Sequence, residues 1–166
     1  MSTDIAKNNA LFREQISEFE SALLAVGGER RTVDNDAGCP LTHRFVPGMY
    51  CREIFMPAGT VMTTMIHNYE HFAFILKGKA RVISEDRGDE IIEAPQVIIT
   101  KAGTKRVLQI LEDMVWCTVH LTENNGKVET KQEADLGALE KIVVSDSYDN
   151  YLQLTAGVKE KLSWHG

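Results

Sequence analysis

Residues 59–78 read GTVMTTMIHNYEHFAFILKG and hold two of the chain's five histidines, His67 and His71. Side chains alternate between two faces along a β-strand, so an extended chain here presents both histidines on one face together with Met65 and Tyr69. In a small barrel one face of each strand points inward, where a ligand cavity forms. The stretch therefore predicts two imidazoles and a phenol ring on the wall of a cavity.

The chain around this stretch consists of short β-rich runs, which read YCREIFM, TVMTTMIH, FAFILKG, KARVISE, EIIEA, QVIITKA, RVLQIL and MVWCTVHL. They are separated by the turn-forming pieces PAG, GK, DRGD, AP, AGT and ED. Short strands at near-regular spacing favour an antiparallel sandwich or barrel over an α/β sheet. We therefore predict a mainly β fold with a barrel over residues 49–122.

Three segments flank the predicted barrel. Residues 1–28 are predicted to form an N-terminal helix, because apolar side chains recur at 4-3-4-3 spacing before two glycines: Phe12, Ile16, Phe19, Leu23 and Val26. This apolar stripe either packs on the chain's own barrel or pairs with a second subunit. Residues 29–48 contain two prolines and are predicted to be a linker, and residues 123–166 a C-terminal extension with a short helical tail.

The composition bounds the class of protein. At 166 residues with 43% apolar side chains, the chain can form one domain with a buried core. A formal net charge of -6 disfavours nucleic-acid binding. The longest apolar runs are about five residues, against roughly 20 for a membrane span. No signal peptide precedes them, so we expect a cytoplasmic protein without a membrane role. Cys39, Cys51 and Cys117 form no CxxC pair, which indicates reduced thiols.

The spacing of residues 59–78 resembles the first motif of the cupin superfamily. That motif is a glycine, five residues, His-x-His, three or four residues, a glutamate, six residues and a second glycine. Met65 stands at the first histidine, His67 at the second and His71 at the glutamate. The resemblance implies an antiparallel cupin (jelly-roll) barrel. It also implies a bend in the chain, because positions four apart in a straight strand lie roughly 13 Å apart.

The run EAPQVIITKAGTKRV resembles the second cupin motif, with Lys101 at its proline, Gly103 at its glycine and Arg106 at its metal-binding histidine. The segments HNYEH, KAGTKRV and EDMVWCTVHLT are similar to those of small cupin-like proteins of tailed phages and prophages. This narrower resemblance implies a protein of the host cytoplasm if the chain is phage-encoded.

The resemblance implies that His67 and His71 contribute to a metal site, for which imidazole ligands favour zinc, iron or nickel. The alternative is a metal-free polar cavity. A third ligand decides between them, and His120 is the candidate. A two-residue turn at Glu112-Asp113 would send His120 outward, and a three-residue turn would bring it inward. The sequence leaves this register open.

Arg106 is charged at all relevant pH values, so in the cavity it would repel a cation and attract a small anion. We expect Tyr69 and Trp116 to line the same pocket. Three classes of function follow: an enzyme such as an isomerase or lyase acting on a small anionic molecule, a binding module for such a molecule, or a non-catalytic structural, assembly or host-interaction protein of phage type. We expect a homo-oligomer, and whether the protein is an enzyme stays open.

Overall fold

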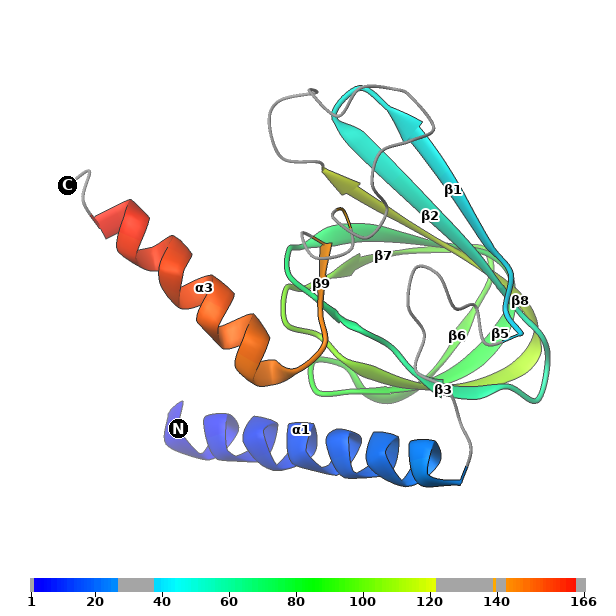
Figure 1. Cartoon of the computed structure of the whole chain (residues 1–166). Coiled ribbons are helices and arrows are strands. Elements are labelled where there is room, and N and C mark those ends of the chain that lie inside the picture. The colour runs from blue at the N-terminus through cyan, green and yellow to red at the C-terminus, as the bar shows by residue number, and fades with distance from the viewer. Residues whose placement is uncertain (1, 27–37, 122–138, 140–142, 164–166) are drawn as a thin grey trace.

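The computed structural model describes residues 2–26, 38–121, 139 and 143–163 (Figure 1). The predicted linker up to residue 37 and half of the predicted C-terminal extension lie outside these ranges. The elements in chain order are α1 (Ser2–Ala25), β1 (Leu41–Val46), β2 (Met49–Met56), β3 (Val61–Thr63), β4 (Ile66–His67), β5 (His71–Ser84), β6 (Gly88–Glu93), β7 (Gln96–Thr100), β8 (Arg106–Leu121), β9 (Val144–Ser145) and α3 (Tyr148–Ser163).

Every strand pair described is antiparallel. The main sheet has the order β1-β2-β8-β5-β6, with β3 also on β8 and β7 also on β5, and β4 pairs with β9 in a second sheet. The two long central strands, β5 with 14 residues and β8 with 16, each pair with different neighbours along their two halves. They thereby close the sheet into a barrel (Figure 1). The predicted fold is confirmed: it is mainly β and antiparallel, with one helix before the strands in the chain and one after them.

Two of the predicted turns, GK and ED, are wrong. Strand β5 runs through Gly78 and β8 runs through Glu112 and Asp113, and the ladder between the strands shifts register from Ile75 to Ala80 instead. Gly78 has a φ of 85°, and a Cβ there would lie 2.2 Å from the carbonyl oxygen of Asp113. Only glycine tolerates both conditions. These polar pieces therefore mark a bend in two continuous strands rather than two hairpin ends.

Part of the predicted linker is also a strand. Residues 41–46 form β1, which pairs with β2 from Leu41 opposite Ile54 to Val46 opposite Met49. The two prolines that suggested a linker, Pro40 and Pro47, lie just outside this strand at its two ends. Prolines at strand ends cost no ladder hydrogen bond, so they bound the strand without preventing it.

The barrel encloses a large apolar core and a smaller one. The large cluster fills the end of the barrel around the bend and includes Met56, Ile75, Val82, Ile92, Ile110 and Met114, all at most 1% exposed. The smaller cluster joins Tyr50 and Met65 to residues that precede and form β9, namely Leu139, Val143 and Val144. The chain after the barrel thus helps to close it near strand β4.

Helix α1 lies along the outside of the barrel (Figure 1). Its Ile16 is 4% exposed, and its Glu20 bonds Thr63 and Lys105. The helix therefore packs on its own barrel, although Phe19 of the predicted stripe is 40% exposed. Among the described residues, no helix is long and apolar enough to cross a bilayer.

Candidate metal centre

Three histidines from three strands meet inside the barrel. His67 ends β4, His71 begins β5 and His120 lies one residue before the end of β8. Their ring centroids are 4.2 Å apart for His67 and His71, 4.3 Å for His71 and His120, and 5.2 Å for His67 and His120. One ring nitrogen from each lies within 4.8 Å of the other two, and all three side chains are buried.

A bend after His67 brings the first two rings together. The backbone N–H of Asn68 donates to the carbonyl of Val143, and its side-chain oxygen accepts from Ser145, so β9 holds the chain at this point. The chain bends at Asn68 and Tyr69 before β5 begins at His71. Two histidines that a straight strand would separate widely are therefore neighbours, as the cupin resemblance implied.

The direction of His120 follows from the continuity of β8. Even-numbered residues face inward from Arg106 to Ile110 and again from Met114 to His120, so the bend changes the direction of the strand but not its parity. Neither of the two turns considered at Glu112-Asp113 exists. The ladder pairs Phe72 with Val119, and its next step places His71 beside His120.

The hydrogen bonds leave nitrogens directed at a common point. His71 Nδ1 donates to the carbonyl of Tyr69 at 3.1 Å, which leaves its Nε2 without a proton. That Nε2 and the Nδ1 of His67 are buried and have no hydrogen-bond partner in the described part of the chain. A buried nitrogen without a partner is costly, and a metal ion would satisfy it. His120 Nε2 lies 3.0 Å from Thr118 Oγ1.

Burial keeps the three rings neutral. It lowers the pKa of His71 to about 4 and that of His120 to about 3. The pKa of His67 is well below its usual value because of burial first, and then because of the neighbouring histidines and Arg106. Neutral imidazole is the form that binds a metal, so the cluster is ready to bind at neutral pH.

The three rings fit a divalent ion. Metal–imidazole bonds of about 2.0–2.1 Å place ligand nitrogens roughly 3.4 Å apart around a tetrahedral ion. The ring nitrogens lie within 4.8 Å of one another, so they would need to approach by at most about 1.4 Å. No Asp or Glu lines the cavity in the described part of the chain, so the candidate ligand set is three histidines rather than two histidines and a carboxylate. The sequence spacing predicted His67 and His71 and left His120 undecided.

The histidines border a cavity of about 80 Å³ inside the barrel, room for an ion and a few water-sized groups. Its lining comes from six strands and the loop between β3 and β4: Arg52, Ile54, Met56, Met62, Thr63, Thr64, Met65, His67, His71, Thr100, Arg106, Leu108, Trp116 and Thr118. His120 borders instead a second hollow, whose lining includes Glu70, His71, Phe72, Ile99 and Leu121. The histidine cluster thus lies between the two spaces.

Arg106 is the buried cation of this cavity. It is 3% exposed, and its Nη2 donates to Thr100 Oγ1 at 3.2 Å. Thr100 pairs across the ladder with His71, so the guanidinium is tied to the strand position opposite a metal-ligand candidate. No carboxylate pairs with Arg106 among the described residues. Burial lowers the pKa of Arg106, while the charges of Asp86 and Glu90 raise it without forming an ion pair with the guanidinium.

The predicted pocket residues have different outcomes. Arg106 and Trp116 line the cavity, and Trp116 is 6% exposed. Tyr69 does not: it is 44% exposed and lies in the bend between β4 and β5. The expectation that Tyr69 shares a face with His67 assumed a straight strand, and the bend at Asn68 breaks that alternation.

Sequence reasoning missed Arg52 and Tyr50. Arg52 lines the cavity from β2, and its charge helps to lower the pKa of both His67 and His120. Tyr50 lies opposite His120 in the ladder and stacks on its ring at 6.0 Å. The alternation of Tyr50, Arg52, Ile54 and Met56 on β2 carried the signal, because it places an arginine on an otherwise apolar inward face.

No protein-family model matches the sequence, and no curated protein matches it. Solved structures do match in fold. An RmlC-like cupin family protein from Methanocaldococcus jannaschii, with a double-stranded β-helix fold, is 14% identical with a TM-score of 0.42, over 55% of this chain and 86% of that one.

Two named enzymes are also among the matching structures. The DMSP lyase DddQ from Ruegeria pomeroyi is 16% identical with a TM-score of 0.48, over 63% of this chain and 55% of that one. Ectoine synthase from P. lautus is 15% identical with a TM-score of 0.39, over 43% of this chain and 52% of that one. At these identities and scores, activity transfers from none of them.

Proposed function

We propose that this protein is a cupin-type protein that holds one divalent metal ion on His67, His71 and His120 and binds a small anionic molecule beside it, at Arg106. One observation carries the proposal: three buried, neutral imidazoles converge to within 4.8 Å beside a buried guanidinium that has no carboxylate partner in the described part of the chain. A cation site and an anion site then occupy one cavity.

The chain's residues have distinct parts in binding. The guanidinium of Arg106 presents a planar fork that matches a carboxylate or phosphate, and its bond to Thr100 fixes the plane of that fork. Arg52 adds a second positive charge from the facing strand. Trp116 and Leu108 supply an apolar wall that excludes water and strengthens each ionic contact. The cavity size favours a molecule of a few non-hydrogen atoms.

The chemistry open to such a site is activation of a bound oxygen atom. When bound, the ion supplies a Lewis acid for a carbonyl or carboxylate oxygen. Arg106 would hold the anionic end of the molecule. No Asp or Glu among the described residues that line the cavity competes for its guanidinium. This arrangement suits isomerase or lyase chemistry on a small organic acid, and it equally suits reversible binding of that acid.

Elemental analysis of the purified protein tests the metal site. We expect close to one equivalent of a zinc, iron or nickel ion in the unmodified protein and none in His67→Ala. His43→Ala, which alters a histidine outside the cluster, is the matched control and should keep the metal. Loss of metal in neither or in both variants contradicts the assignment.

Calorimetry with malonate and with inorganic phosphate tests the anion site and its class. We expect one of them to bind the metal-loaded protein with a stoichiometry of one and to bind Arg106→Gln at least about tenfold more weakly. Arg81→Gln, on the exposed outer face, should bind as the unmodified protein does. Equal binding by Arg106→Gln would remove Arg106 from the site.

A further inference from the structure

Two thiols face each other on the outside of the barrel. Cys51 on β2 and Cys117 on β8 are 66 residues apart in the chain, and their sulfurs lie 3.0 Å apart. In the ladder Cys51 is opposite Val119 and Cys117 is opposite Glu53, so the cysteines occupy diagonal positions on one face. Their neighbours Arg52, Trp116 and Thr118 line the cavity, so the thiols lie on the opposite face.

We propose that Cys51 and Cys117 are a reversible thiol–disulfide pair, which a peroxide oxidises to an intramolecular bond across β2 and β8. A disulfide has an S–S length of about 2.05 Å, so the sulfurs need to approach by only about 1 Å. Both cysteines are free in the structure. Their approach requires side-chain rotation within an existing ladder rather than a change of fold.

The surroundings assign the two thiols different parts. Cys51 is half-buried and thus reachable from solvent, whereas Cys117 is 8% exposed. Arg44 lies opposite Cys51 on β1 and pairs with Glu53, which is opposite Cys117 in the ladder. Burial raises the pKa of Cys117 to about 12, which suits the thiol that reacts second.

The reaction balances in two steps. The sulfur of Cys51 attacks one oxygen of hydrogen peroxide, the O–O bond breaks, and a sulfenic acid and one water form. The sulfur of Cys117 then attacks the sulfenic sulfur of Cys51, and the S–S bond forms as the S–O bond breaks. The hydroxyl of the sulfenic acid leaves with the thiol proton of Cys117 as a second water. Two thiols lose two electrons, and one peroxide gains them. A dithiol reductant reverses the bond by thiol–disulfide exchange.

The test is oxidation of the folded, full-length protein with hydrogen peroxide, followed by quenching, denaturation and alkylation with N-ethylmaleimide. Mass spectrometry should show one alkylated cysteine instead of three and a cross-linked peptide pair that contains Cys51 and Cys117. Treatment with dithiothreitol should restore three alkylated cysteines. Three alkylated cysteines after oxidation, or a bond that includes Cys39, would overturn the proposal, and so would a bond found only between chains.

Two variants sharpen the result. Cys39→Ser removes the thiol that is 1% exposed in the apolar core and should leave the cross-link intact. Cys51→Ser should abolish it, and the half-buried position keeps the fold. A cross-link that persists in Cys51→Ser, or one that is lost in folded Cys39→Ser, would overturn the proposal.

Discussion

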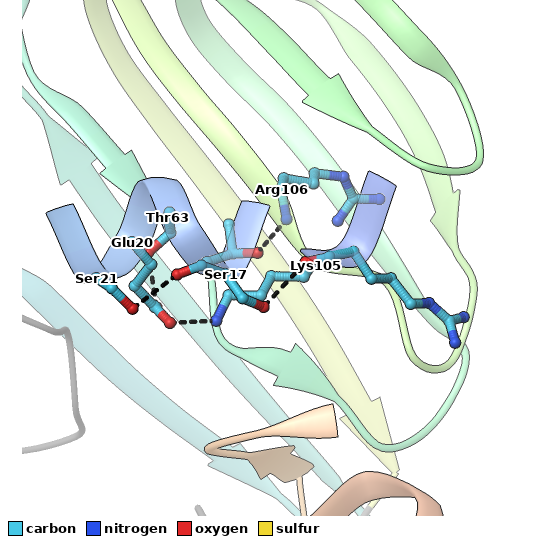
Figure 2. Close-up of polar contacts among 8 residues, drawn as sticks. Ser17, Glu20, Ser21, Thr63, Lys105 and Arg106 are labelled. Carbon is cyan, nitrogen blue, oxygen red and sulfur yellow. Dashed lines mark hydrogen bonds and ion pairs between the residues drawn. The ribbon is translucent and has the colours of Figure 1, made fainter. Parts of the chain in front are cut away.

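Lys105 and Arg106 are adjacent cations, each 3% exposed, with opposite surroundings. The ammonium of Lys105 faces helix α1 and lies 2.6 Å from a carboxylate oxygen of Glu20, whose other oxygen accepts from Thr63 at 2.8 Å (Figure 2). The guanidinium of Arg106 faces the cavity and has a threonine hydroxyl as its side-chain partner. One buried charge is neutralised within the protein, and the other is not.

The difference separates a structural charge from a functional one. Burying an ion costs several kcal/mol unless a partner of opposite charge compensates it. The pair of Lys105 and Glu20 contains its own compensation and ties the helix to the barrel. Arg106 has no carboxylate at ion-pair distance among the described residues, although Asp86 and Glu90 act on it electrostatically, and the anion proposed above would bring the negative charge. Four predictions test this division, and a fifth follows from how the two residues are joined.

The largest effect is expected from Glu20→Ala. It leaves Lys105 charged, buried and without its carboxylate, which should lower the free energy of unfolding by about 3–5 kcal/mol. Urea denaturation measures this. The double variant Glu20→Leu with Lys105→Met removes both charges and should recover most of the loss. A double variant as unstable as Glu20→Ala would show that the helix contact, rather than the ion pair, carries the stability.

Arg106→Met should behave in the opposite way. Removal of an uncompensated charge should leave the free energy of unfolding unchanged or higher, while anion affinity falls by about 10- to 100-fold, the value of one charge-assisted contact. Urea denaturation and calorimetry with malonate measure the two quantities on one preparation. A loss of stability as large as that of Glu20→Ala would place Arg106 among the structural charges.

The histidines add a third kind of buried group, one kept neutral by burial. In the metal-free protein His71 takes up its proton near pH 4 and His120 near pH 3, whereas unfolded histidine does so near pH 6.5. Between pH 6.5 and 4 the unfolded state binds more protons. The free energy of unfolding should therefore decrease as the pH is lowered, on the order of 1 kcal/mol per pH unit for each histidine.

Thermal or urea unfolding with a chelator present, from pH 7 to pH 4.5, measures this slope. Carboxylates also titrate in this range, so the comparison is with His71→Gln, in which the slope should be shallower. Identical slopes in the two proteins would mean that His71 is protonated in the folded state. Metal should raise stability across this range without flattening the slope, because it binds the neutral rings and leaves the protons bound by the unfolded state unchanged.

The smallest effect is expected from Asp89→Ala. Asp89 pairs with Arg81 at 2.5 Å, but both side chains are 48% exposed, so solvent screens the pair. We expect little or no change in the free energy of unfolding. Urea denaturation beside Glu20→Ala makes the comparison direct. A loss as large as that of Glu20→Ala would show that burial does not set the strength of these pairs.

The barrel and two of the three clustered histidines could be predicted from the sequence, because both depend on local patterns. Strand alternation and motif spacing identified His67 and His71, and the parity of β8 brings in His120 once its continuity is known. Glu112 and Asp113 misled the turn prediction because an exposed bend in a strand has the polarity of a turn. The homo-oligomer and the phage-type role stay predictions.

The contact between Glu20 and Lys105 could not be predicted, because 85 residues separate the partners. Each residue alone is typical of a solvated surface, and only the path of α1 across the barrel buries them. The prediction that Tyr69 lines the pocket was wrong for a related reason. The hydrogen bonds that hold the bend at Asn68 come from Val143 and Ser145, far along the sequence. Non-local contacts decided both cases.

The backbone that joins Lys105 to Arg106 has a counterpart across the ladder. Thr63 bonds Glu20 of the helix (Figure 2). The next residue, Thr64, exchanges two hydrogen bonds with the backbone of Arg106, at 2.9 and 3.0 Å. In each of the pairs Thr63–Thr64 and Lys105–Arg106, the first residue contacts the helix and the second lines the cavity. Coupling between two sites is reciprocal. If docking of the helix strengthens anion binding at Arg106, the bound anion strengthens docking of the helix by the same free energy. Amide hydrogen exchange around Ser17 and Glu20 should therefore slow when malonate binds, which makes helix α1 a reporter of occupancy. Exchange that is insensitive to saturating malonate would show that the two sides of this backbone act independently.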